Sequence, residues 1–368
     1  MEIDFHFGAT YVVARLAGFD HGRAEIIATC SQYVDDTVNS GALRFKTGES
    51  YYRISTAHEL TDYHIALSVD ERRTWVPFHF LPGNDASGDP SRAFYNRIIC
   101  RPHSEVAKEM ARACIAKQDT AHGLHRLGIT AHVFIDTWAH QGFAGIHHRI
   151  NMASDITLVH PHEQRLHWLH LFKHGGPRAL WGHVTRPLMQ LFTDHAFPMG
   201  HGAVLHYPDH PFRQWRYTNG DGQVIVRDNP TDFLTALDEL CRVFRRYLAK
   251  DAAAQVEGLS EPDREKIRAL ISKLTNEDPK LRLNAWLKAV HDAEFSFGAA
   301  KASYAPHGPG SWKQQALGID DARVGDGDEF DYTPAFDTSN WKLFHDAAQA
   351  HQHDVLREIL PRFGICAV

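Results

Sequence analysis

The stretch that decides the fold is Thr120–Phe143, TAHGLHRLGITAHVFIDTWAHQGF. Its apolar residues recur at helical spacing, and we expect one helix that ends near Gly142. Within it His132, Asp136 and His140 follow one another at intervals of four residues. At about 100° per residue, these three side chains share one face of the helix. A solvent face would be rich in Lys and Glu and a core face in Leu and Val, so this face indicates a functional site.

Imidazole and carboxylate groups that project together from one helix are a ligand set for zinc or a similar divalent ion. We therefore predict that His132, Asp136 and His140 bind metal. His122 and His125 lie on the same face. These two histidines are either further ligands or buried histidines that are hydrogen-bonded to the backbone. Of the two, we keep His125 as a possible additional ligand.

One helix cannot enclose a metal ion, so further ligands must come from other segments. Asp4 and His6 are separated by one residue, and in extended backbone both side chains would point the same way, so we expect both as ligands. Asp35 and Asp36 are adjacent at the predicted end of a helix, where two carboxylates repel unless a cation neutralises them. We expect Asp36 to bind metal, and either aspartate to orient or deprotonate a catalytic water.

Four more candidates lie in turn-like segments. His58 and His201 are expected to bind metal, and glycines on both sides of His201 allow close backbone approach. His79 and Asp209 are candidates for additional ligands or for partners of ligands. The aromatic residues Tyr207, Trp215 and Tyr217 are expected to form the apolar wall of a substrate pocket.

Composition sets the limits of the interpretation. The chain has 368 residues, of which 43% are hydrophobic and 23% charged, as is typical of globular proteins. Its net charge of −6 argues against binding to nucleic acid, and no apolar stretch is long enough to span a membrane. Five scattered cysteines and the lack of a signal-peptide pattern favour the cytoplasm, or export without a signal peptide. The composition is abnormal in one respect, because the chain contains 27 histidines.

The pattern of the whole chain predicts a mainly α protein with small β-hairpins. A metal-binding domain is expected over residues 1–230, with a helical extension over 231–368 packed on it. The expected helices cover residues 10–18, 21–38, 104–117, 120–142, 163–174, 178–197, 231–250, 261–275, 278–294 and 339–360. Hairpins are expected at 41–56 and around 219–222, an extended loop at 75–83 and a long loop at 303–337.

The central motif also resembles a known one. The residues Leu127-Gly128-x-x-x-His132-x-x-x-Asp136-x-x-Ala139-His140 resemble the signature of the heterokaryon-incompatibility HET-C family. They are similar, too, to the H-x-x-x-D core of bacterial zinc-dependent phospholipase C and of fungal single-strand-specific zinc nucleases. Over its whole length the chain looks closest to a bacterial family of unknown function.

The resemblance implies a zinc phospholipase C-like helical bundle with two or three zinc ions. It makes Asp136 similar to a carboxylate that bridges two ions, His132 and His140 similar to ligands of different ions, and Asp35 or Asp36 similar to an acidic ligand from an early helix. His58, His6 and His201 match the remaining histidines in order. In the secreted enzymes the amine of an N-terminal Trp binds zinc. This chain has no Trp there, so Asp4 is expected to replace it.

The expected function is zinc-dependent hydrolysis of a phosphoester, such as a phospholipid or another phosphodiester. One alternative is a metal phosphohydrolase of the HD type, because His-Asp pairs occur at His291-Asp292, His345-Asp346 and His353-Asp354. The other is a non-catalytic helical scaffold with a structural metal. Structural zinc sites commonly include cysteine, and the cysteines lie outside every His/Asp cluster, which disfavours the scaffold. The oligomeric state is left open.

Overall fold

The computed structural model describes residues 1–57, 69–84, 93–159, 199–319 and 328–366. In these parts the chain is mainly helical, with two small three-stranded sheets, and this coarse prediction is confirmed. The expected helices at 163–174 and 178–197 lie outside the described residues. No helix in the described ranges is both long and apolar enough to cross a membrane.

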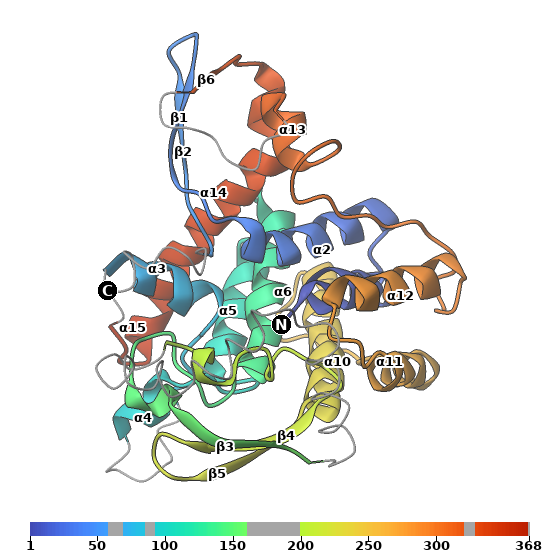
Figure 1. The fold of residues 1–368 in the computed structure, drawn as a ribbon. Coiled ribbons are helices and arrows are strands. Elements are labelled where there is room, and N and C mark those ends of the chain that lie inside the picture. Colours follow the sequence, from blue (N-terminus) through green and yellow to red (C-terminus); the bar gives the residue numbers. More distant parts are fainter. Residues whose placement is uncertain (58–68, 85–92, 160–198, 320–327, 367–368) are drawn as a thin grey trace, which may run out of the picture.

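The helix predicted from the central motif, α6 (Gly123–Ala139), runs through the middle of the molecule (Figure 1). Four helices pack against it: α2 (His21–Asp36), α5 (Glu105–Ala116), α10 (Asn229–Ala249) and α14 (Asn340–His353). Neighbours on several sides leave nearly all residues of α6 buried, including its polar ones. The polar face that the sequence indicates is therefore an interior face.

The remaining helical elements are shorter or lie further out. In chain order they are η1 (Asp4–Ala9), α1 (Thr10–Ala17), α3 (Val69–Phe78), α4 (Ala93–Ile98), η3 (Arg149–Asn151), η4 (Gly202–Val204), α11 (Glu261–Lys273), α12 (Pro279–His291), α13 (Trp312–Leu317), η5 (Pro334–Thr338), η6 (Asp354–Ile359) and α15 (Leu360–Arg362). The elements η1 and η6 are π-helical.

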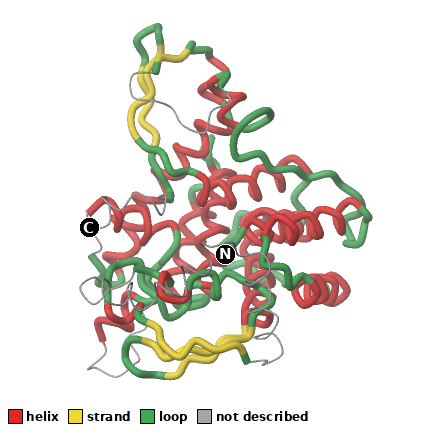
Figure 2. Tube along the Cα trace, viewed as in Figure 1, coloured by secondary structure: helices red, strands yellow, loops and turns green. Residues whose placement is uncertain are grey.

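The two sheets lie at opposite ends of the helical body (Figure 2). One has the order β2-β1-β6 and is built from β1 (Gly41–Phe45), β2 (Ser50–Arg53) and β6 (Glu329–Phe330). The other has the order β3-β4-β5 and is built from β3 (Ala153–Leu158), β4 (Gln214–Asn219) and β5 (Val224–Asp228). Both expected hairpins are thus present, and each carries a third strand that the sequence pattern did not predict.

Three local expectations are wrong. The segment expected as an extended loop from residue 75 is helical up to Phe78, although Pro77 lies inside the helix. Proline has no N–H, so Pro77 cannot donate a hydrogen bond to the carbonyl of Arg73. That carbonyl instead accepts a hydrogen bond from the Gln352 side chain at 2.9 Å. The second error concerns the start of the central helix: α6 begins at Gly123 and not at residue 120, and the Thr120 hydroxyl donates a hydrogen bond to the Lys117 carbonyl.

The segment expected as a loop at 303–337 also holds structure. The helix α13 begins after Ser311, whose hydroxyl accepts a hydrogen bond from the amide of Gln314. Further along, β6 pairs in parallel with β1, so that Phe330 lies opposite Phe45. The sequence did not predict α13 and β6, because the segment is rich in glycine and aspartate and both elements are short. They are stabilised by contacts with neighbouring elements.

One hydrophobic core crosses the expected boundary at residue 230. Phe5 contacts Phe233 edge to face, with ring centroids 4.7 Å apart, and lies 6.0 Å from Trp286 of α12. These residues belong to the same buried cluster as Val133 of α6. The C-terminal part therefore packs directly onto the segment that carries the N-terminal site candidates.

Close packing of α2 on α6 gives a first prediction. A Cβ atom added to Gly128 would lie 2.4 Å from the Cβ atom of Cys30 and 2.5 Å from the Ile27 carbonyl oxygen, so one helix must move. We expect Gly128→Ala to lower the free energy of unfolding by about 1–3 kcal/mol. Gly22→Ala, in the first turn of α2 with its nearest neighbour at 3.7 Å, is the matched control and should raise it by about 0.5–1 kcal/mol. Urea unfolding compares the two; equal effects would contradict the packing argument.

Candidate metal centre

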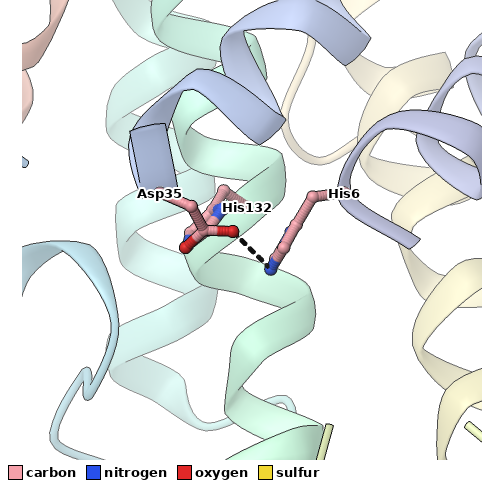
Figure 3. Close-up of side chains that lie close together, drawn as sticks. All are labelled: His6, Asp35 and His132. Carbon is pink, nitrogen blue, oxygen red and sulfur yellow. Dashed lines mark ion pairs between the residues drawn. The ribbon is translucent and has the colours of Figure 1, made fainter. Parts of the chain in front are cut away.

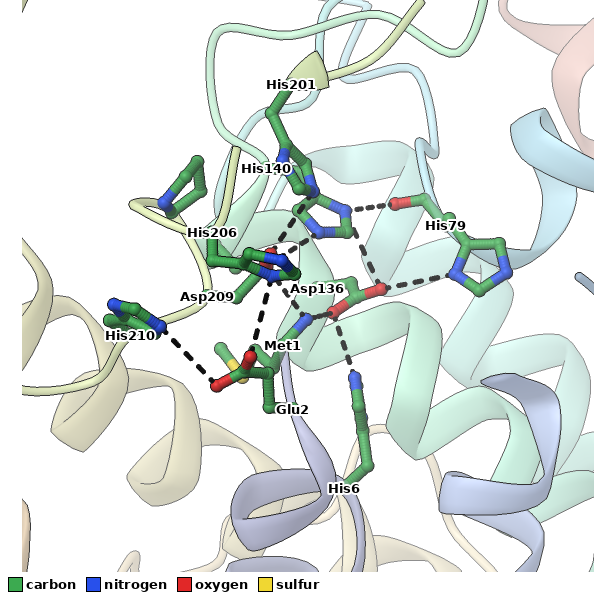
Figure 4. Close-up of polar contacts among 12 residues, drawn as sticks. Met1, Glu2, His6, His79, Asp136, His140, His201, His206, Asp209 and His210 are labelled. Carbon is green, nitrogen blue, oxygen red and sulfur yellow. Dashed lines mark hydrogen bonds and ion pairs between the residues drawn. The ribbon is translucent and has the colours of Figure 1, made fainter. Parts of the chain in front are cut away.

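The interior face of α6 carries the predicted triad, and the structure brings it together with residues from four other segments. His132 and Asp136 are completely buried and His140 is 4% exposed. Around them lie His6 from η1, and His79, His201 and Asp209 from the loops that follow α3 and precede β4 (Figure 4). Asp35 from α2 also belongs to the cluster.

Asp136 lies at the centre of this cluster. Its Oδ1 atom lies 2.7 Å from the amino group of Met1 and 3.3 Å from His6 Nε2. Its Oδ2 atom lies 3.2 Å from His132 Nε2, 3.6 Å from His140 Nδ1 and 3.7 Å from His79 Nδ1. Despite these neighbours, Oδ2 is buried without a hydrogen bond from the described residues. Burial alone would raise the pKa of Asp136, but His140, the amino group and His132 hold that pKa well below its usual range.

Four histidines of the cluster are oriented by backbone carbonyls. Since a carbonyl only accepts, each of these rings donates the N–H of one nitrogen. The bonds are His132 Nδ1 to Ser31 O at 2.7 Å, His140 Nδ1 to His79 O at 2.7 Å, His201 Nδ1 to Leu205 O at 2.7 Å and His79 Nε2 to Thr56 O at 2.8 Å. In a neutral ring the other nitrogen then carries a lone pair. Metal-binding histidines are held in this way.

These lone pairs face other electron-rich atoms. His132 Nε2 and His79 Nδ1 are 3.2 Å apart, and both lie near Asp136 Oδ2. Burial lowers the pKa of His132 to about 4, so this ring is neutral at pH 7. Two lone pairs and a carboxylate oxygen repel one another unless a cation lies between them. The chemistry of the donor set therefore fits a divalent ion at His79, His132 and Asp136.

Two further groups adjoin this one. His6, Asp35 and His132 form the first (Figure 3), and Asp35 Oδ2 lies 3.9 Å from His6 Nε2. Neither ring nitrogen of His6 has a hydrogen bond within the described parts of the chain. His140, His201 and Asp209 form the second, with Asp209 Oδ1 3.3 Å from His140 Nε2 and Asp209 Oδ2 3.4 Å from His201 Nε2. Because neighbouring groups meet at His132 and around Asp136, all three can act as one centre.

The amino group of Met1 lies among the carboxylates. It is 2.7 Å from Asp136 Oδ1 and 3.3 Å from Asp209 Oδ1. Burial by itself would lower its pKa, but Asp136, Asp209 and Asp35 together raise the pKa to about 11. Sequence reasoning assigned this place to Asp4 and missed the amine, because backbone groups leave no mark in a side-chain pattern.

The expectation for Asp4 is corrected. Residues 4–9 form the π-helix η1, not extended backbone, so Asp4 and His6 point in different directions. Asp4 is buried against Arg282 of α12, with its Oδ2 atom 2.7 Å from the guanidinium Nε. Glu2, which no sequence pattern singled out, also pairs with Arg282 and lies 3.5 Å from His206.

The two aspartates that end α2 have different surroundings, and only Asp35 belongs to the cluster. Asp35 faces the cluster, where its Oδ1 atom lies 3.8 Å from both His79 Nδ1 and His132 Nε2. Asp36 points away and accepts hydrogen bonds from Tyr304 and Gln32, so the expectation that Asp36 binds metal is corrected. Burial and the neighbouring carboxylates raise the pKa of Asp35 well above its usual range, although the amino group opposes them.

Other candidates lie outside the cluster. His125 Nε2 bonds to Asn340 of α14 at 2.9 Å, so the interpretation as a structural histidine applies. Trp215 and Tyr217 are 0% and 2% exposed in the core beneath β4 and cannot wall an accessible pocket. Tyr207 packs at the edge of the same core. His58 lies outside the described residues.

The chain was also compared with known proteins. Residues 1–359 match the model of a "Family of unknown function (DUF6765)". The chain belongs to this family. No match was found among curated proteins or among solved structures. The family match spans η1 to η6, and so it includes every residue of the three groups.

Proposed function

We propose that this DUF6765 protein is a metal-dependent hydrolase of phosphoesters. The observation that carries the proposal is the buried Asp136 Oδ2 atom, which lacks a hydrogen bond in the described structure and faces imidazole nitrogens at 3.2–3.7 Å. Three adjoining groups of His and Asp favour two or three ions, and this mix of nitrogen and oxygen donors favours zinc.

The motif supports the same class of reaction. The residues that resemble the signature of the HET-C and zinc phospholipase C families are those that meet in the cluster: His132, Asp136 and His140. We propose on this basis that the helical arrangement is related to the zinc phospholipase C-like bundle. The substrate class follows from the same resemblance, since these families include enzymes that hydrolyse phosphodiesters.

Within such a site the residues of the chain have separable roles. Bound zinc would polarise the phosphoryl group and lower the pKa of a water molecule. The residues that would hold the ions are His6, His79, His132, Asp136, His140, His201 and Asp209. Asp35 is suited to orient the attacking water and accept its proton, because its side chain is 30% exposed while Asp136 is buried. The Met1 amino group offsets part of the negative charge of the carboxylates.

Of the three His-Asp pairs of the HD-type alternative, His353-Asp354 alone belongs to a possible metal-binding group in the described residues, together with Glu358. His291 and Asp292 bond to one another on the surface at 3.0 Å. Asp346 bonds to Tyr51 and Lys342, while Asp354 pairs with Arg126 and Lys117. Since the aspartates of the last two pairs are already held by cations or hydroxyls, the pairs do not form one centre.

The test compares two histidines of α6. We expect His132→Ala to lose at least one zinc ion per chain by elemental analysis and most hydrolysis of bis(4-nitrophenyl) phosphate, because His132 belongs to two groups. His125→Ala, on the same helix but bonded to Asn340, should keep the metal content of the wild type. Equal metal content in both variants would contradict the proposal.

Chelation separates an enzyme from a scaffold. The helical core around α6 is apolar and extensive, so we expect a chelator to abolish hydrolysis while the helical circular-dichroism signal persists at room temperature. Loss of that signal would instead favour the scaffold with a structural metal.

A further inference from the structure

A cavity of about 230 Å³ adjoins the candidate metal centre at Asp35. Its wall is formed by the end of α2, the end of β2, the loop before α13, and the helices α13 and α14. Six of its lining residues carry the argument: Tyr33, Asp35, Arg53, Lys313, Trp341 and His345. Because Asp35 faces His6 and His132 on its other side, the cavity and the centre share this carboxylate.

The cavity contains buried positive charge. Arg53 from β2 and Lys313 from α13 are 7% and 5% exposed. Each also interacts with other parts of the chain, which fixes its position. Burial lowers the pKa of His345 to about 3; Arg53 and, to a smaller extent, Lys313 add to the lowering, and a hydrogen bond with the Ile54 backbone opposes it.

His345 adds an unsatisfied polar group to the same wall. It is 1% exposed, and its Nδ1 atom has no hydrogen bond from the described residues. A hydrogen bond with the Ile54 backbone already involves this ring, and with a pKa of about 3 the ring is neutral and can donate from one nitrogen only. Of the acidic lining residues, Asp36 is held by Tyr304 and Gln32, and Asp35 is directed at the metal centre.

We infer that this cavity binds a second anionic group, a phosphate or carboxylate, of a small phosphoester whose scissile phosphate lies at the metal centre. The inference rests on the proposed function and narrows its substrate class. Arg53 and Lys313 supply the charge. A volume of about 230 Å³ is below the range of about 300–1,000 Å³ typical of ligand pockets, and the wall is mostly polar. The subsite therefore suits a compact anionic group and not an acyl chain.

Three 4-nitrophenyl phosphodiesters test this inference, with a carboxylate, a phosphate or a neutral carboxamide at the far end of a short alkyl arm. We expect kcat/KM of the wild type to be about 10-fold higher for the charged substrates than for the amide, through KM. The relative size of the carboxylate and phosphate effects identifies the group preferred. In Lys313→Met this 10-fold ratio should fall to about 1. Lys46→Met, an exposed lysine paired with Asp331, is the matched control and should keep it.

A second measurement does not depend on hydrolysis. Calorimetry on the chelator-treated protein should show binding of inorganic phosphate that Lys313→Met loses and Lys46→Met retains. Phosphate binding without any hydrolysis would leave the subsite standing and remove the proposed function. Two results would contradict the subsite but not the proposed function. One is hydrolysis with equal kcat/KM for all three substrates; the other is a ratio of charged to neutral substrate that is unchanged in Lys313→Met.

Discussion

Asp136→Asn should remove more bound metal than any other single substitution in the cluster. Each carboxylate oxygen of Asp136 faces a different set of nitrogens, with His6 on one side and His79, His132 and His140 on the other. An amide keeps the shape but has only one oxygen and no charge. Loss of a hydrogen-bond partner of a metal ligand already lowers metal affinity by about 10- to 100-fold. We expect a larger loss here, with hydrolysis reduced at least about 100-fold.

Elemental analysis and hydrolysis rates measure the result, with circular dichroism to show that the variant is folded. Asp209→Asn is the matched comparison, because Asp209 faces two histidines, His140 and His201, whereas Asp136 faces four. It should lose fewer ions than Asp136→Asn. If Asp136→Asn binds as much metal as the wild type, the carboxylate is a structural partner of the Met1 amino group and the centre has been misinterpreted.

Arg282→Met should have the largest effect on stability. The Arg282 side chain is fully buried and pairs with Asp4, which is 1% exposed, and with Glu2. Removing one partner of a buried ion pair leaves the other charge uncompensated, which costs about 3–5 kcal/mol. Thermal and urea unfolding should show a loss of this size. Since Arg282 holds the segment that carries His6, the variant should also bind metal more weakly.

Two comparisons make this prediction specific. Arg268→Met removes an exposed pair with Glu265 within α11 and should change the free energy of unfolding by at most about 1 kcal/mol. Adding Asp4→Asn to Arg282→Met should recover part of the lost stability, because the buried charge is then gone. An additive loss in the double variant would show that the ion pair is not the cause.

Helical spacing predicts what lies on one element but not how elements meet. His132, Asp136 and His140 follow from the period of α6, and the structure brings them together. The choice between Asp35 and Asp36 depends on the rotation of α2 in its last turn, which adjacent residues of the same type cannot reveal. Asp4 was misplaced because its partner, Arg282, lies 278 positions away.

The fold shows the same limit. Long amphipathic helices such as α5 and α10 were predicted within a few residues, whereas β3 and α13 depend on tertiary contacts that no local pattern records. His79 and Asp209 were only secondary candidates, since residues in loops carry no periodicity that shows where they point.

The pairing of Asp4 with Arg282 also sets an order of events during synthesis on the ribosome. Chains grow at about 5–20 residues per second, so roughly 15 to 60 s separate the addition of residue 6 from that of residue 282. During this interval the π-helical segment has no α12 to hold it. In a nascent chain, α2 can pack against α6 long before the position of His6 is fixed. Metal loading is therefore expected to be a late, post-assembly step, and a ribosome stalled before α12 should release a chain that is largely helical but unable to retain its ions.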